Sequence, residues 1–144
     1  MALIFTDPNS VGPFASFQLK DVQARVFKLD YTFFSTSGVN TKLGVLPADA
    51  SILKITTWLK TAFAGNSVSS PTLSLGTASG GTQFSNAVAL TNTTGTLVAH
   101  SPVTGIMQPY NVPNTTDINI WANGGCSTGN PTSGELYVYV EFVR

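Results

Sequence analysis

Few residues in this 144-residue chain have the chemistry that catalysis requires. His100 is the only histidine and Cys126 the only cysteine. A serine or cysteine nucleophile usually needs a base such as histidine within reach, and a third group that orients the base. No G-x-S-x-G motif is present, and the sequence NGGCST around Cys126 contains nothing that would lower a thiol pKa. We therefore expect His100 on the surface at a strand end and Cys126 as a small buried or half-buried residue.

Carboxylates are equally sparse. Between Thr61 and Gly134 the single charged residue is Asp117. Glu135 and Glu141 fall on one face of a predicted strand but lie about 20 Å apart along it, which is too far for the paired carboxylates of a glycosidase. The chain shows no metal-ligand spacing, and its Gly/Ser segments lack the lysine of a phosphate-binding loop. The sequence therefore predicts no catalytic, cofactor-binding or metal-binding residue, and a protein that is not an enzyme.

Charge is low and balanced over the whole chain. Seven basic residues match seven acidic ones, and charged residues make up 10% of the total, against about 25% in typical soluble domains. This balance argues against nucleic-acid binding, which needs a basic patch. No apolar run approaches the roughly 20 residues of a membrane span. The N-terminus lacks signal-peptide features, so we expect synthesis in the cytoplasm and regard the sequons at Asn92 and Asn114 as chance.

Small uncharged residues replace the missing charges. Thr, Ser, Asn and Gly together supply 56 of the 144 residues. Such a surface is polar but carries few charges, and near-neutral surfaces associate more readily than charged ones. The composition fits a protein that lives in an assembly, and equally an ordinary β-domain with threonine-rich strands.

Alternating apolar and polar residues predict short, two-faced strands. A helix competes over residues 52–63, but the β-branched and aromatic residues there favour a strand. Continuous apolar runs, which are typical of buried parallel strands, do not occur, so an antiparallel arrangement is expected. The predicted strands cover residues 22–34, 52–63, 71–77, 95–100, 117–122 and 135–143.

Segments rich in Gly, Pro, Ser and Asn separate these strands. Residues 35–44, 101–116 and 123–134 are predicted to be loops, and residues 83–90 stay open between a short helix and a strand. Two prolines and a glycine make residues 1–20 an extended N-terminal arm. We therefore predict an all-β fold, an antiparallel β-sandwich or jelly-roll-like barrel, with a single β-sandwich domain over residues 21–144.

Aromatic residues are the interface candidates, because Trp and Tyr bury much area and keep a polar group. Trp58 lies on the strand face opposite the expected core residues, and Tyr137 and Tyr139 lie between two glutamates on the last strand. An alternative reading is that these rings only cover the second face of their own sheet. In the arm, Phe14 and Phe17 belong to the segment FASFQL, which could pair with a sheet edge in this chain or in a neighbour.

Three segments resemble a known group of proteins. The segments GVLPADASILKITTWLKTAFAG, PTLSLGT and the closing GELYVYVEFVR are similar to sequences of small virion structural proteins of tailed bacteriophages. In those proteins a G-x-LP-A turn leads into a long strand ending near TAF-x-G, followed by TLSLGT. The match covers roughly residues 22–144 and is densest over residues 44–77. The shared motifs build turns and strands, so no binding residue carries over.

The resemblance implies a capsid decoration (cement) protein that binds the outside of the major capsid protein shell and stabilises it. The implied partners are the major capsid protein and further copies of this chain, with a homotrimer favoured. The implied location is the outer capsid surface of the virion, with no nucleic acid, membrane or cofactor involved. The alternative is a receptor- or carbohydrate-binding module of a phage tail fibre or spike, in which Trp58 or Trp121 would stack on sugars.

Overall fold

The computed structural model describes residues 22–69, 71–90, 92–101 and 115–143. The arm predicted over residues 1–20, with Phe14 and Phe17, lies outside these ranges, as does most of the loop predicted over residues 101–116. Within the described ranges the one helix, η1, has three residues, so no helix there is long enough to cross a membrane. The elements are β1 (Val22–Asp30), η1 (Tyr31–Phe33), β2 (Val39–Leu46), β3 (Ser51–Ala64), β4 (Thr72–Gly76), β5 (Ser85–Ala89), β6 (Leu97–His100), β7 (Ile118–Gly125) and β8 (Ser133–Val143).

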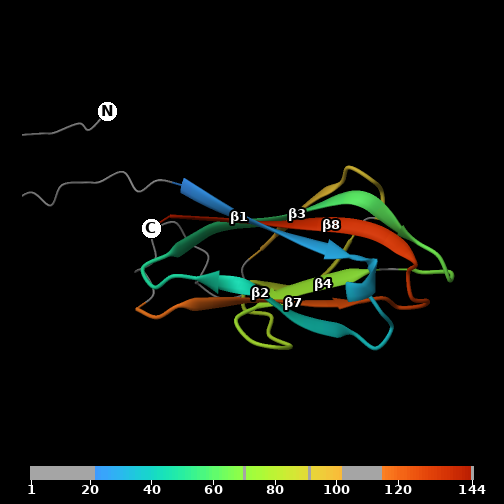
Figure 1. Cartoon of the computed structure of the whole chain (residues 1–144), viewed down its shortest axis with the longest axis horizontal. Coiled ribbons are helices and arrows are strands. Elements are labelled where there is room, and N and C mark those ends of the chain that lie inside the picture. The colour runs from blue at the N-terminus through green and yellow to red at the C-terminus, as the bar shows by residue number, and fades with distance from the viewer. Residues whose placement is uncertain (1–21, 70, 91, 102–114, 144) are drawn as a thin grey trace, which may run out of the picture.

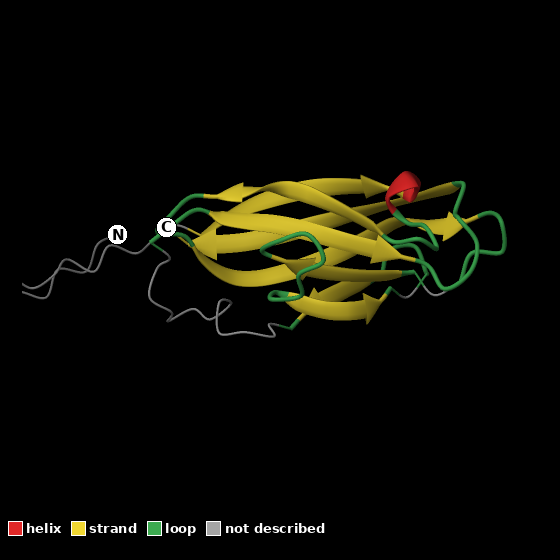
Figure 2. Ribbon diagram, turned by 90° about the horizontal axis from the view of Figure 1, so that it is seen from below, coloured by secondary structure: helices red, strands yellow, loops and turns green. Residues whose placement is uncertain are grey.

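The strands form two antiparallel sheets packed face to face (Figure 1). Sheet A has the strand order β1-β8-β3-β6, and sheet B has the order β2-β7-β4-β5. Among the strands of the described ranges, most consecutive pairs alternate between the sheets, and only β4 and β5 are neighbours in both sequence and sheet. This order is that of a jelly roll, which confirms the predicted fold class. The strands run roughly along the long axis of the sandwich, and η1 lies towards one end of it (Figure 2).

Alternation along the strands builds the core between the two sheets. On β8, the residues Leu136, Val138 and Val140 are at most 1% exposed, as the pattern over residues 135–143 predicts. They face the equally buried Leu75 and Ile120 of sheet B within one hydrophobic cluster. Removal of this apolar area from water supplies the main stabilisation of the fold, at about 25 cal/mol per Å².

The first strand is shorter than predicted. It ends at Asp30, whose carboxylate accepts a hydrogen bond from the Thr32 backbone amide at 2.9 Å and caps η1. The turn redirects Phe33 and Phe34 into the end of the core, where the Phe34 ring lies 4.4 Å from the Phe63 ring, centroid to centroid. Strand continuation to residue 34 is therefore wrong, because a local cap competes with the ladder at this point.

Three segments without a clear strand pattern are strands in the structure. The loop predicted over residues 35–44 is wrong, because β2 pairs with β7 from Val39 to Leu46 as an edge strand. The loop predicted from residue 123 is wrong at its start, since β7 continues to Gly125. The open window over residues 83–90 contains β5. Pairing with a neighbour, rather than local propensity, holds each of these segments extended.

Two side chains pair with the part of β3 that extends beyond the short strand β6. The Phe63 backbone amide donates to Asn92 Oδ1 at 2.7 Å, and Asn92 Nδ2 donates to the Phe63 carbonyl at 2.6 Å. Thr94 Oγ1 similarly accepts from the Ala62 amide at 3.2 Å. These residues take the place of the strand that would otherwise pair with this part of β3.

Candidate functional site

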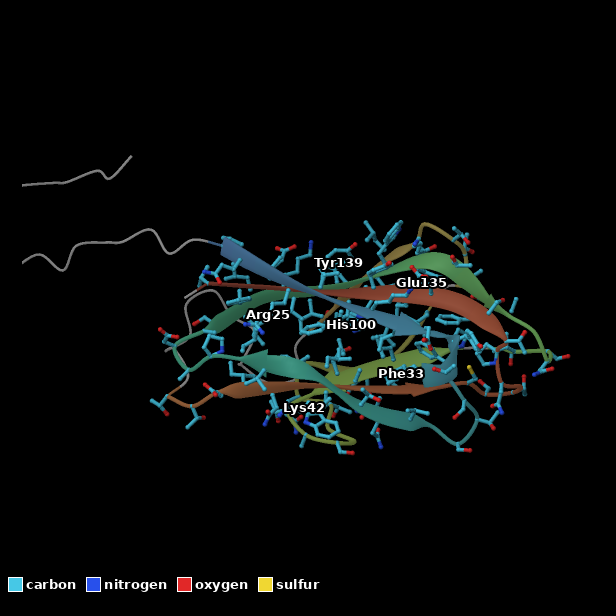
Figure 3. All side chains as sticks on the ribbon, viewed as in Figure 1. Arg25, Phe33, Lys42, His100, Glu135 and Tyr139 are labelled. Carbon is cyan, nitrogen blue, oxygen red and sulfur yellow. The ribbon has the colours of Figure 1, made fainter. Side chains whose placement is uncertain are left out.

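The outward side of sheet A brings three predicted interface candidates together. Strand pairing places Trp58 of β3 opposite Tyr137 of β8, and Tyr139 lies two residues further along β8. Figure 3 shows Tyr139 and Glu135 on the outer side of the upper layer. We name this surface the aromatic face; its two central rows, in strand order, are Val26, Tyr139, Thr56 and Ala99, and then Lys28, Tyr137, Trp58 and Leu97.

The rings of the aromatic face pack against one another. The Trp58 and Tyr137 rings are stacked, with centroids 5.9 Å apart and an interplanar angle of 29°. The Tyr137 and Tyr139 centroids are 6.5 Å apart. The Lys60 ammonium lies over the Tyr137 ring, 5.7 Å from its centroid, at a distance that permits a cation–π interaction. Neighbouring side chains therefore hold each ring in place.

Glu135 joins three residues of this face. Its carboxylate pairs with the ammonium groups of Lys28 at 2.9 Å and Lys60 at 2.8 Å, and accepts a hydrogen bond from the Tyr137 hydroxyl at 2.7 Å. The hydrogen bonds from Lys60, Lys28 and Tyr137 lower the pKa of Glu135 to about 2, and Glu135 in turn raises the pKa of both lysines. One carboxylate near the rings thus pairs with two ammonium groups, and the cluster keeps one net positive charge.

Aliphatic side chains surround the rings and remain exposed. Of the four large hydrophobic side chains exposed in the described ranges, three lie on this side of sheet A: Val22 at 63%, Val26 at 51% and Leu97 at 66%. The fourth is Tyr31. In the middle of the face, the buried hydroxyl of Thr56 has no hydrogen-bond partner among the described residues. An apolar face with ordered rings is typical of an interaction surface.

Sequence reasoning found the rings but missed their surroundings. Trp58, Tyr137 and Tyr139 are half-buried on the outer face of their own sheet, and their binding role stays a prediction. Val26, on β1, and Leu97, on β6, join them only through strand pairing. The sequence carries no signal for that register, because the partner strands are more than 30 residues away along the chain.

Trp121 lies on the other sheet. It is half-buried on β7, opposite Lys42 of β2 and Gly76 of β4. Near it, Asn123 accepts a hydrogen bond from the Gly80 amide and donates one to the Gly81 carbonyl. These bonds hold the loop between β4 and β5, yellow-green beneath β7 in Figure 1, against the outer side of sheet B. The two tryptophans thus occupy opposite outer faces of the sandwich.

His100 is buried, so its prediction as a surface residue is wrong. It is 4% exposed and lies between the two layers (Figure 3). Ser85 Oγ of sheet B lies 2.8 Å from its Nδ1, and Thr57 Oγ1 lies 3.2 Å from its Nε2. Burial of the imidazole lowers its pKa to about 4. The hydroxyls of Ser85 and Thr57 satisfy both ring nitrogens, so the neutral imidazole can be buried at little cost. The residues next to His100 in the sequence do not indicate this environment.

The His100–Ser85 pair is oriented against catalysis. Ser85 Oγ donates its proton to the Asn86 carbonyl at 2.8 Å, so it accepts from His100 Nδ1–H rather than being deprotonated by it. Ser85 is also only 1% exposed. Cys126 is buried as predicted, and burial raises the pKa of its thiol. Across the described ranges, no three residues of the His, Cys, Asp or Glu type gather in a way that could hold a metal ion.

The chain is similar to known proteins in its fold. No protein-family model matches the chain, and no curated protein matches it. The capsid of Ralstonia phage GP4 contains a similar chain, with a TM-score of 0.57 and 17% identity over 86% of this chain and 84% of that one. The cyanophage Pam1 capsid contains another, with a TM-score of 0.58 and 16% identity over 96% of both chains. This chain has a fold found in phage capsids.

A third similar chain belongs to the acid-stable capsid of the Helicobacter pylori bacteriophage KHP30. Its TM-score is 0.53, with 12% identity over 88% of this chain and 94% of that one. At these identities the likeness concerns the fold. It agrees with the resemblance to virion structural proteins of tailed bacteriophages that the sequence motifs carry, and the matched chains are capsid components.

Proposed function

We propose that this protein is a decoration (cement) protein of a tailed phage, which binds the outside of the shell built by the major capsid protein and stabilises it. The observation that supports this most is the jelly-roll likeness to three phage capsid chains over 84%, 96% and 94% of their own lengths. Those chains are therefore of about the same size as this one. A small single-domain capsid component fits an accessory protein on a shell.

Surface chemistry supports the same role. Charged residues make up 10% of the chain and cancel to a net charge of zero. Glu135 is paired with two lysines on the aromatic face. A protein of this kind binds through shape and apolar area rather than through long-range attraction. As a homotrimer it would contact several capsid subunits at once, so weak contacts would add up to firm binding.

The alternative glycan-binding role has less support from the geometry. A sugar-stacking platform needs an aromatic ring with one face open. Trp58 stacks against Tyr137, and Lys60 lies over the Tyr137 ring. Tyr137 therefore covers one face of the Trp58 ring, which leaves only the other face for a sugar.

Salt provides a sharp test of binding through an uncharged surface. Purified full-length protein is mixed with phage shells that lack it, and bound protein is measured by co-sedimentation. We expect saturation at hundreds of copies per shell, and an apparent Kd that changes less than about threefold between roughly 50 mM and 500 mM NaCl, because few unpaired charges contribute. Decorated shells should also withstand a higher temperature before they open.

Two outcomes would contradict the proposal in different ways. Absence of binding, or binding of only a handful of copies per particle, would remove the decoration role and favour a tail component. Saturating binding that weakens about a hundredfold over the same salt range would keep the role but show that charges supply the contact. An unrelated jelly-roll protein of similar size serves as the control for trapping in the pellet.

A further inference from the structure

The aromatic face lacks a covering partner within the described part of the chain. Val26 and Leu97 lie at its two edges with more than half of their side chains exposed, and the rings lie between them. Leu97 and Ala99 point outward from β6, whereas His100 points inward. An edge strand that turns its leucine to the outside and its histidine to the inside is arranged for a partner on the outer face.

The face is also ordered before anything binds to it. Stacking fixes Trp58 against Tyr137, and Glu135 fixes Tyr137 and the lysines on either side. A partner therefore loses little free energy to ordering these side chains, which favours tight binding by a small segment. The Thr56 hydroxyl in the same rows has no hydrogen-bond partner among the described residues. If the Thr56 side chain rotated, a polar group of a bound partner would satisfy this hydroxyl.

The segment before β1 has the composition to cover this face. Its first 19 residues contain one charged side chain, Asp7, and the apolar stretch FASFQL with Phe14 and Phe17. The central rows of the aromatic face likewise contain one charged side chain, Lys28, which shares the Glu135 carboxylate with Lys60. The contact would therefore bury few charges, with Asp7 and Lys20 in the segment and Lys28 in the central rows.

The position and length of the segment fit as well. It joins β1 at Val22, which lies on the outer side of sheet A, six residues along the strand from Lys28. Six residues of strand span about 20 Å, and Phe17 and Phe14, which lie five and eight residues before Val22, can be up to about 18 Å and 29 Å from it in an extended segment. No Gly or Pro occurs between Phe14 and Val22, so the sequence provides no tight turn that would fold the segment back onto its own sheet.

We infer that residues 1–20 of one copy lie across the aromatic face of a second copy, with Phe14 and Phe17 against Val26, Trp58 and Tyr139. The contact is head-to-tail, because the segment of each copy meets the face of the next. Such contacts close into a ring when the rotation between copies allows it. The inference does not depend on the proposed shell binding, since it concerns contacts between copies of this chain alone.

Cross-linking in the full-length protein tests the contact directly. A photo-reactive amino acid replaces Phe17, and isotopically heavy and light copies are mixed and re-equilibrated before irradiation. We expect cross-links from position 17 to Val26, Trp58 or Tyr139, about half of them joining a heavy copy to a light one. Cross-links within one copy would show that the segment covers its own face. Cross-links to sheet B, or none between protein chains, would overturn the inference.

The oligomeric state provides a second, independent readout without shells. Sedimentation of the full chain should show an oligomer whose dissociation constant rises about 30-fold in Trp58→Ala, as expected for a central aromatic in an interface. A Phe14→Ser, Phe17→Ser double variant should do the same without touching the domain. Trp121→Ala, on the opposite face, is the matched control and should leave assembly unchanged. A monomeric wild type, or equal effects of the two tryptophan variants in folded protein, would overturn the inference.

Discussion

Lowering the pH from 6.5 to 4 should remove about 3 kcal/mol of unfolding free energy through His100 alone. Burial lowers the pKa of His100 from 6.5 to about 4 in the folded domain. Between these values the unfolded chain binds a proton at His100 and the folded chain does not, so unfolding becomes easier as the pH falls. The loss begins near the unfolded pKa and is complete below the folded one.

Denaturant unfolding of wild type and His100→Gln, measured from about pH 7.5 to pH 4, isolates this effect. The stability advantage of the wild type over the variant should shrink by about 3 kcal/mol across the range. Glu135 does not confuse the result, because its pKa falls from 4.5 to about 2 on folding and its stabilisation is lost mainly below pH 4.5. Parallel pH profiles for the two proteins would show that the imidazole is not the titrating group.

Gly134→Ala should destabilise the fold by about 3 kcal/mol or more. Gly134, in β8, has a φ of +137°, which side chains rarely adopt, and an added Cβ would lie 2.1 Å from Phe63 Cδ1. The Phe63 ring cannot give way easily, because it is 1% exposed and packs against Phe34. Relief would therefore require movement of β3 or β8, the two central strands of sheet A.

Gly80→Ala measures the cost of a positive φ without a steric clash, and so serves as the control for Gly134→Ala. Gly80 also has a positive φ, +74°, but no atom lies within 4 Å of the position that its Cβ would occupy. This variant should lose only about 1 kcal/mol. Thermal and urea unfolding of both variants give the comparison. Equal losses at the two positions would mean that Phe63 accommodates the methyl group and that the core at this end is loosely packed.

The alternation of apolar and polar residues predicted the strands that form the core. It failed for strands that are held extended by pairing with a neighbouring strand. β8 and most of β3 follow the pattern because each buries one face. β2 contains Asn40, Lys42 and Gly44, which resemble a loop, yet it is held as an edge strand by its ladder to β7. A register shift between Ile52 and Lys54 likewise turns Ile52 into the core, a change that periodicity cannot foresee.

The candidate surface could be predicted only in part for the same reason. Trp58 and the two tyrosines were identifiable as outward aromatics from their own strands. Their contact with Val26 and Leu97 depends on which strands are neighbours and in what register. His100 was misplaced because β6 turns its more apolar residues outward, against the usual rule that the apolar side of a strand faces the core.

The Asn92 amide, which occupies both backbone groups of Phe63, bears on how the protein can be produced. Its sequence, Asn92-Thr93-Thr94, would be a sugar acceptor in a secretory pathway. A glycan on Nδ2 would replace one hydrogen of this amide and place a bulky group beside β3, which would weaken the bond to the Phe63 carbonyl. Recombinant material from bacteria keeps the unmodified amide, so we expect it to be more stable than material glycosylated at Asn92.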